Sequence, residues 1–192
     1  MPRRILYLGL NPPPHVLHYP VITTQKLETP AISQALALWP HFTHVLFTSK
    51  TTVRYWFEIK PDFDKIALAI GPSTAAELLL RGITPLIAPV PTQEGLLALT
   101  RTLSNPYFFF PRSRKARPLL TDSLQDPFFA LDLYDTLFQR PEPLPNFAEI
   151  DEIIFTSPST VQGFLRIFGK LPRDKILTPI GPVTEEALRT HT

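Results

Sequence analysis

The sequence FTSKTTV at residues 47–53 returns later in the chain as FTSPSTV at residues 155–161. A second pair follows the first, with IGPST at residues 70–74 and IGPVT at residues 180–184. The two motifs keep the same order and nearly the same spacing in both copies. Two different motifs rarely recur together by chance, so the arrangement indicates a duplicated supersecondary unit. The alternative is that any α/β protein has similar strand-to-helix turns.

Both motifs have the features of a buried strand followed by a helix. Val45–Phe47 and Ile153–Phe155 are short apolar runs, typical of strands that are covered on both faces. In the Ile-Gly-Pro motif, the proline suits the first turn of a helix, where its missing N–H costs nothing. Strands that alternate with helices are joined by crossovers, so we expect parallel sheets and an α/β fold.

The same alternation extends along the rest of the chain. We expect Thr29 to cap a helix that runs from Pro30 to Trp39 and stops at Pro40. Further strands are expected at residues 65–70, 85–88, 107–110 and 175–180, and further helices from Pro72 to Gly82, over 92–103, near 116–122 and over 185–188.

Two segments, 18–27 and 129–139, are extended in pattern but are not separated from the next strand by a helix. They flank the complete central unit, 28–128. The simplest topology is therefore a terminal domain formed by residues 1–17 with 140–192, an inserted domain formed by 28–128, and two antiparallel linker strands. A ribbon of this kind can act as a hinge.

The composition excludes several classes of protein and site. The 192 residues include no cysteine, which excludes disulfides, thiolate metal sites and a cysteine nucleophile. His41 and His44 have no convincing carboxylate partner, so no metal site is expected. A net charge of +2 is too small to predict nucleic-acid binding. No apolar run approaches the ~20 residues of a membrane span. Ile5–Leu10 is too short for the apolar part of a signal peptide, so we expect a cytoplasmic protein.

Four motifs, taken in order, resemble the uroporphyrinogen-III synthase family. They are the repeated Phe-Thr-Ser strand end, the repeated Ile-Gly-Pro-x-Thr turn, the segment 111–120 with its Pro-Arg-Ser and Arg-Pro-Leu-Leu, and Leu131–Thr136. The last is similar to that family's linker pattern, valine or leucine-x-x-Tyr-x-Thr. The resemblance covers nearly the whole chain. It implies two small α/β domains joined by a two-stranded ladder, the first built from both chain ends.

The chain departs from this family pattern in two places. Residues 11–15 stand where family members usually have a helix and a further strand, and the chain stops at Thr192, where they continue with more strand and helix. The terminal domain is therefore expected to be small. This departure leaves an alternative open: a non-catalytic, degenerate two-lobed protein of the same fold that binds an anion.

The resemblance implies a lyase that cyclises hydroxymethylbilane to uroporphyrinogen III, with inversion of the last pyrrole ring, in heme and tetrapyrrole biosynthesis. It also implies no metal and no organic cofactor, and a monomer that contacts the preceding enzyme of the pathway transiently. The substrate has four linked pyrroles and eight carboxylates. Since the bilane closes by itself to the wrong isomer, the enzyme must hold the conformation from which ring inversion is faster.

The carboxylates of such a substrate need hydrogen-bond donors. Helix N-termini supply free N–H groups and the positive end of the helix dipole. In parallel sheets, ligands gather at the carboxyl ends of the strands. The candidate substrate-binding residues are therefore the hydroxyl-bearing side chains at these turns: Thr48, Ser49, Ser73, Thr74, Ser157, Ser159, Thr160 and Thr184. The alternative for each is an ordinary helix cap.

Two further candidates follow from the resemblance. Tyr134 is the candidate catalytic acid that assists departure of the substrate hydroxyl, and the alternative is a half-buried strand tyrosine. Arg117 matches the family's arginine near a helix start and is a candidate for contact with a substrate carboxylate. The neighbouring Arg112, Arg114 and Lys115 fit a solvated charged face better than a nucleic-acid site.

Overall fold

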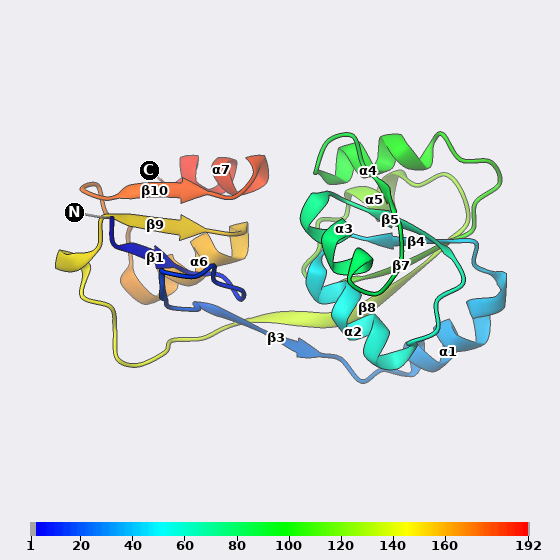
Figure 1. Cartoon of the computed structure of the whole chain (residues 1–192), viewed down its shortest axis with the longest axis horizontal. Coiled ribbons are helices and arrows are strands. Elements are labelled where there is room, and N and C mark those ends of the chain that lie inside the picture. The colour runs from blue at the N-terminus through cyan, green and yellow to red at the C-terminus, as the bar shows by residue number, and fades with distance from the viewer. Residues whose placement is uncertain (1–2, 192) are drawn as a thin grey trace. The chain divides into compact units, whose positions relative to one another are not determined.

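The computed structural model describes residues 3–191, which form ten β-strands and seven α-helices. The chain divides into two compact units (Figure 1). Unit 1 consists of Met1–Thr24 with Thr136–Thr192, and unit 2 of Gln25–Asp135. Strands and helices alternate along the chain, and strands joined by crossovers pair in parallel, which confirms the predicted α/β class.

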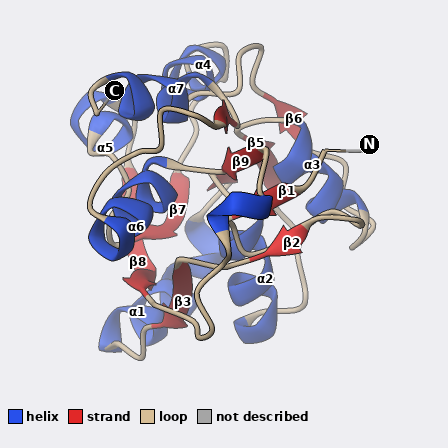
Figure 2. Cartoon of the chain, turned by 90° about the vertical axis from the view of Figure 1, so that its left-hand side faces the viewer, coloured by secondary structure: helices blue, strands red, loops and turns tan. Residues whose placement is uncertain are grey.

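Unit 1 contains a four-stranded sheet in the order β10-β9-β1-β2, and every neighbouring pair is parallel. Figure 2 shows α6 and α7 next to this sheet. The elements are β1 (Ile5–Tyr7), β2 (Leu17–His18), β9 (Glu152–Phe155), β10 (Ile176–Pro179), α6 (Pro158–Phe168), α7 (Pro182–Arg189) and a 3-10 turn at Phe147–Glu149.

The core of unit 1 is a single buried cluster among the residues that the structure describes. Leu6 of β1 and Ile153 and Phe155 of β9 pack against Phe164 of α6 and Leu188 of α7. Strand side chains alternate between the two faces of a sheet, so these strand residues share one face. Both helices of unit 1 therefore pack in the cluster on that face.

Unit 2 contains a six-stranded sheet in the order β3-β8-β7-β4-β5-β6. Its strands are β3 (Ile22–Lys26), β4 (His44–Phe47), β5 (Ile66–Ala69), β6 (Leu86–Ile87), β7 (Phe108–Ser113) and β8 (Phe128–Phe138). Its helices are α1 (Pro30–Leu38), α2 (Lys50–Ile59), α3 (Pro72–Leu79), α4 (Gln93–Thr100) and α5 (Leu119–Ser123), with a 3-10 turn at Trp39–His41. The outer parts of β3 and β8 belong to unit 1.

Buried side chains cover both faces of the sheet in unit 2. Phe109 packs with Trp39 and Trp56 on the face covered by α1, α2 and α3. Phe108 and Phe110 point to the opposite face and pack against α4 and α5. All three phenylalanines are fully buried. A strand that is covered on both faces needs an unbroken apolar run, which explains the sequence of β7.

β8 lies between β7 and β3 in the sheet. It is parallel to β7, with Ser113 in register with Tyr134 after a bulge. On its other side, the N–H of Leu27 donates to the C=O of Leu133 at 2.9 Å, and the N–H of Gln139 donates to the C=O of Val21 at 3.1 Å. Residue numbers rise along one segment as they fall along the other, as in an antiparallel pair.

The start and the end of α1 differ from the expectation. The Thr29 hydroxyl makes no capping bond and is buried without a partner, because the N–H of Ile32 donates to the C=O of Thr29 instead. The helical segment also does not stop at Pro40, because α1 ends at Leu38 and Trp39–His41 continue it as a 3-10 turn. Proline is compatible with the first residues of a helical turn, where no N–H is needed.

Candidate functional site

The carboxyl ends of the parallel strands in unit 2 meet at one edge of its sheet. β4 leads into α2, β5 into α3 and β6 into α4, so three helix N-termini lie at this edge. Ser113 ends β7, and its register partner Tyr134 lies beside it in β8. The edge therefore brings together helix N-termini and hydroxyl side chains from segments far apart in the sequence.

Tyr134 belongs to a cluster of four hydroxyl groups, from Ser49, Thr52, Ser113 and Tyr134. The phenol oxygen lies 3.0 Å from Ser49 Oγ, and Ser49 Oγ lies 2.8 Å from Thr52 Oγ1. The Tyr134 side chain also forms hydrogen bonds with Thr52 and Ser113. Ser49 has a second role, because its Oγ accepts the Thr52 N–H at 3.0 Å and caps α2. The cluster thus joins β8 to the start of α2.

The Tyr134 side chain is only 6% exposed, and its ring centroid lies 5.7 Å from that of Tyr55. Burial raises the pKa of the phenol, since it disfavours the charged phenolate. Hydrogen bonds with Ser49, Thr52 and Ser113 oppose this shift but are weaker than the effect of burial. The phenol is therefore protonated at neutral pH, so it can donate a hydrogen bond or a proton.

The other candidates at this edge differ in their exposure. Thr48 is partly buried and follows β4 directly, whereas Ser73 is exposed in the first turn of α3. Thr74 is only 2% exposed and does not cap α3, since the N-cap is Gly71 and no side chain caps it. A Cβ on Gly71 would lie 2.8 Å from Pro91 Cβ, so the turn needs a glycine for close approach.

Arg117 is paired with a carboxylate of the protein itself. Its Nη2 donates to both carboxylate oxygens of Glu94, in the first turn of α4, at 2.9 Å each. A substrate carboxylate would have to share or replace this partner. The other cations of the segment also have acidic partners, as expected for a charged face: Arg112 with Asp132, and Arg114 and Lys115 with Asp135.

Unit 1 has a similar strand-to-helix turn after β9. Ser157 caps α6, and Thr160 Oγ1 accepts the N–H groups of Thr156 and Ser157 at 3.1 and 3.2 Å. The same hydroxyl donates to the Ser157 C=O at 2.7 Å. These bonds form a capping box, in which the buried Thr160 hydroxyl is used entirely by the local backbone. Ser159 is partly buried in the first turn of α6.

Thr184 is also turned inward, at the start of α7. It is 2% exposed, and its hydroxyl donates to the Ile180 C=O at 3.1 Å. The N-cap is Gly181, whose φ of 85° lies in the left-handed region that favours glycine. Capping is therefore wrong as the alternative role of Thr74 and Thr184. Since Thr74, Thr160 and Thr184 are all buried, substrate contact would require their hydroxyls to turn outward, and that role stays a prediction.

A comparison with known protein families identifies the family of this chain. Residues 14–192 match the family described as "Uroporphyrinogen-III synthase HemD". The chain belongs to this family. The match confirms the resemblance that the four sequence motifs indicate, and it includes both strand-to-helix turns, the hydroxyl cluster and β8.

Three similar proteins are each no more than 26% identical to this chain. A protein of Methanothermobacter thermautotrophicus named "Putative uroporphyrinogen-III synthase" is 26% identical, over 90% of this chain and 78% of that protein. The crystal structure of uroporphyrinogen-III synthetase from Helicobacter pylori has a TM-score of 0.68 at 19% identity, and covers 98% of this chain and 88% of that one. A mutant Thermus thermophilus uroporphyrinogen III synthase has a TM-score of 0.66 at 22% identity, over 98% and 89%. These similarities establish the fold.

The synthase-family motifs did not reveal every polar residue at this edge. Thr52 and Ser113 were missed as partners of Tyr134. The Ser-x-x-Thr spacing of residues 49–52, which recurs at 157–160, was a usable signal for Thr52. The contact of Ser113 with Tyr134 depends on the alignment of β7 with β8, which the sequence alone does not specify.

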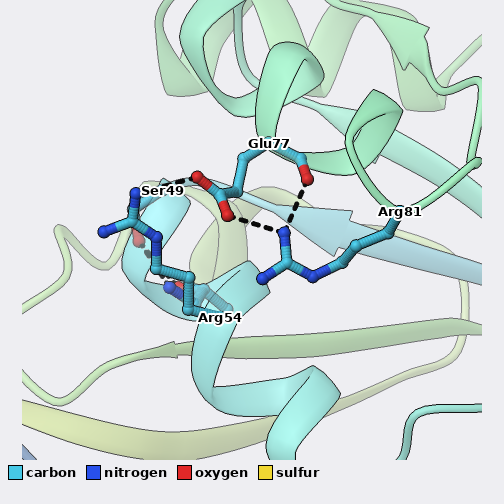
Figure 3. Close-up of polar contacts among 5 residues, drawn as sticks. Ser49, Arg54, Glu77 and Arg81 are labelled. Atoms are coloured by element: carbon cyan, nitrogen blue, oxygen red, sulfur yellow. Dashed lines mark hydrogen bonds and ion pairs between the residues drawn. The ribbon is translucent and has the colours of Figure 1, made fainter.

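A buried carboxylate, Glu77, joins α2 to α3 (Figure 3). The sequence motifs do not indicate this residue. Glu77 accepts from Arg54 Nη2 at 3.0 Å and from Arg81 Nη1 at 2.6 Å. Burial favours the neutral acid, but the hydrogen bonds and charges of the two arginines outweigh it, so the pKa of Glu77 lies below its ordinary value. Glu77 is therefore ionised at neutral pH.

Within residues 3–191, no group of three or more His, Asp or Glu side chains is placed to hold a metal ion. In the same part of the chain, no helix is both long enough and apolar enough to cross a membrane.

Proposed function

We propose that this chain is a uroporphyrinogen-III synthase, a lyase that cyclises hydroxymethylbilane to uroporphyrinogen III with inversion of the last pyrrole ring. Family membership over residues 14–192 supports an enzyme of heme and tetrapyrrole biosynthesis over a non-catalytic anion-binding protein. The observation that supports the chemistry most directly is the protonated Tyr134 phenol, which lies 3.0 Å from the Ser49 hydroxyl at the start of α2.

In this proposal the protein binds the substrate mainly through neutral donors. The backbone N–H groups at the starts of α2, α3, α6 and α7 bind carboxylates, and the dipoles of these helices favour negative charge. Accessible hydroxyls add further donors: Thr48, Ser49, Ser73, Ser157 and Ser159. Arg117 binds a substrate carboxylate in place of the Glu94 carboxylate. Thr74, Thr160 and Thr184 are buried beneath these donors, and their hydroxyls bind the substrate only if they turn outward. Neutral donors hold a flexible polyanion without fixing it as tightly as a cage of cations, so the last ring can still invert.

Tyr134 assists the first chemical step, in which the bond between carbon and the terminal hydroxyl breaks and water leaves. The phenol donates a hydrogen bond to the departing oxygen, and Ser49 keeps the phenol oriented. The pKa of Tyr134 is raised, so complete proton transfer is costly. The main contribution is therefore a strong hydrogen bond in the transition state, and substrate carboxylates can supply the proton itself.

The proposal extends to the organisation of the chain. The two α/β domains arose by internal duplication, with residues 1–17 and 140–192 in one and 28–128 in the other. The segments 18–27 and 129–139, which contain β3 and all but the first residue of its antiparallel partner β8, form a hinge. The enzyme acts as a cytoplasmic monomer without a cofactor, and contacts the preceding enzyme of the pathway transiently. Solution scattering with and without product should show closure, and identical profiles would contradict the hinge.

A coupled assay tests the central proposal. Freshly made hydroxymethylbilane is supplied to the purified chain, the products are oxidised to porphyrins, and the type III and type I isomers are separated. An excess of type III over the enzyme-free reaction is the expected result. Type I alone, at the spontaneous rate, would show that the chain is not a synthase.

A further inference from the structure

We propose that Arg54 binds a carboxylate of the substrate, and that the buried Glu77 is a positioning residue that holds Arg54 in place. This inference rests on the proposed function, because it takes the polycarboxylate substrate from there. Neither residue belongs to the hydroxyl-bearing turns or to the four motifs that identify the family.

The position of Arg54 on α2 places its charge near the hydroxyl cluster. Arg54 lies five residues after the helix cap Ser49. Side chains of an α-helix lean toward its N-terminus, so the Arg54 side chain extends back toward the end that Ser49 caps. Figure 3 draws Arg54 together with Ser49 and Glu77. α2 and α3 both begin at the carboxyl edge of the sheet, so the pair of Arg54 and Glu77 bridges two helices that line this edge.

The two partners differ sharply in their contact with solvent. The Glu77 side chain is 8% exposed, whereas the Arg54 side chain is 44% exposed. A buried carboxylate thus anchors a guanidinium that a ligand can reach. A guanidinium has five N–H donors in a rigid plane, so it can hydrogen-bond to more than one carboxylate at a time. Glu77 restricts the conformations of Arg54 and thereby lowers the entropy that ligand binding would otherwise cost.

The local charge favours an anion. Arg54 and Arg81 share the single carboxylate of Glu77, and Lys50 lies four residues before Arg54 on the same face of α2. Arg54, Lys50 and Glu77 together have a net positive charge beside the positive end of the α2 dipole, whereas Arg81 lies beyond the end of α3. A substrate with several carboxylates would be attracted to this side of the hydroxyl cluster.

Arg81 contacts the same carboxylate but has a structural role. Its Nη1 donates to both the Glu77 C=O at 2.7 Å and the Glu77 carboxylate, and its guanidinium lies over the Phe57 ring, 5.4 Å from the centroid. It follows the end of α3, where a cation stabilises the last carbonyls of a helix. Arg81 is therefore a matched control for Arg54. Replacing either arginine removes one hydrogen-bond donor from Glu77, but Arg81 lies beyond the C-terminal end of α3, away from the site.

The experiment uses the full chain and two readouts. Arg54→Gln, Arg54→Lys, Arg81→Gln and Glu77→Gln are compared with the unmodified protein. Binding of uroporphyrin III, a fluorescent octacarboxylate, is measured by titration at two salt concentrations. The kcat and KM for hydroxymethylbilane are measured separately, and thermal unfolding shows whether each variant is folded.

We expect Arg54→Gln to weaken uroporphyrin III binding by about tenfold, the usual order for a lost hydrogen bond between charged groups, and to make binding less dependent on salt. KM should rise with little change in kcat, because the contact is equally strong in the ground state and the transition state. Arg54→Lys should recover part of the affinity. Glu77→Gln should raise the dissociation constant severalfold, and Arg81→Gln should change it by less than twofold.

Equal affinities of Arg54→Gln and the unmodified protein would overturn the inference. So would equal losses in Arg54→Gln and Arg81→Gln, since both would then act through stability alone, or a failure of the unmodified protein to bind uroporphyrin III. If Arg54→Gln binds normally while the unmodified protein makes type III product, the inference fails and the proposed function stands. If uroporphyrin III binding depends on Arg54 but no type III product forms, the binding site stands and the synthase assignment fails. Should Glu77→Gln fail to fold, the comparison of Arg54 with Arg81 still decides the role of Arg54.

Discussion

The two Ser-x-x-Thr turns of this chain begin helices in the same way but use their hydroxyls differently. In unit 1, Thr160 Oγ1 accepts two backbone N–H groups and donates to the Ser157 C=O, so its bonds close within the turn. In unit 2, Thr52 Oγ1 lies 2.8 Å from Ser49 Oγ, which lies 3.0 Å from the Tyr134 phenol. One turn is a closed cap, and the other is connected to a buried tyrosine.

The difference comes from the strand that lies next to each turn. In unit 2, β4 is followed in the sheet by β7 and then β8, which supply Ser113 and Tyr134. In unit 1, β9 lies next to β1, which leads to Gly9. A Cβ at Gly9 would lie 2.5 Å from the Thr156 side chain, so there is no space for a polar side chain at that position. Two similar turns therefore differ in their hydrogen bonds because different residues lie beside them.

Removing the phenol of Tyr134 should give the largest effect. If the Tyr134 phenol assists departure of the substrate hydroxyl, Tyr134→Phe should lower turnover by roughly 10²-fold, within the range of lost acid catalysis, with folding intact. Turnover of hydroxymethylbilane and thermal unfolding are the measurements. Tyr107→Phe is the control and should keep full turnover, because Tyr107 directly precedes β7, at the end of the strand opposite Ser113. Unchanged turnover in Tyr134→Phe would make Tyr134 a structural residue.

Replacing the equivalent threonines should separate stability from activity. Thr160→Val leaves two partly buried N–H groups without their acceptor, so it should lower the free energy of unfolding by about 2 kcal/mol. Thr52→Val should cost less stability, about 1 kcal/mol, but should reduce turnover severalfold because Ser49 and Tyr134 lose a neighbour. Urea unfolding and kcat test this pair. A larger loss of turnover in folded Thr160→Val than in Thr52→Val would break the comparison.

The second pair of threonines tests whether buried hydroxyls reach the substrate. Thr74 and Thr184 are each 2% exposed, and Thr184 already donates to Ile180. We expect Thr184→Val, which loses this hydrogen bond, to cost about 1 kcal/mol of stability. Both Thr74→Val and Thr184→Val should leave the ratio of type III to type I product unchanged. The ratio is measured for both single variants and for the double variant. A shift toward type I in the double variant would show that these hydroxyls turn toward the substrate and steer the last ring.

The smallest expected effect concerns pH and the other end of β4. His44 is 6% exposed, and burial lowers its pKa below the ordinary value. As pH falls through about 6.5, the unfolded chain binds a proton that folded His44 does not, so the free energy of unfolding should decrease. The decrease should level off below the folded pKa. Carboxylates with lowered pKa, such as Glu77, destabilise the fold only below about pH 4.5.

Unfolding in urea at several values between pH 5 and pH 7 measures the His44 effect. His44→Gln should flatten the dependence of stability on pH in this range. An unchanged slope in this variant would assign the dependence to other groups.

Several features of the fold were accessible from local sequence. The apolar run before Thr48 predicted β4, and Pro72 and Pro182 predicted the starts of α3 and α7. These features depend on residues within one turn or one strand, where propensity and alternation act directly. The expectation for Thr29 was only partly right: Thr29 is the N-cap residue of α1, but its C=O, and not its hydroxyl, accepts the Ile32 N–H.

The connections that define the candidate site were not accessible in this way. Ser49 and Tyr134 are 85 residues apart, and Arg54 and Glu77 are 23 residues apart. Arg117 pairs with Glu94 only because α4 and the segment before α5 lie close together in the fold. Each contact requires a particular strand order, register or helix packing, and many partners of the same residue type are compatible with the sequence.

The sequence by itself determined the family, the α/β alternation and the residue types at the two strand-to-helix turns, because these are encoded in short motifs and their order. Only the tertiary structure decided which hydroxyls reach Tyr134, which are used up by the backbone and which carboxylate anchors Arg54. The physical reason is that a hydrogen bond needs its two atoms about 3 Å apart, and for residues on different strands or helices that distance is set by sheet register and core packing.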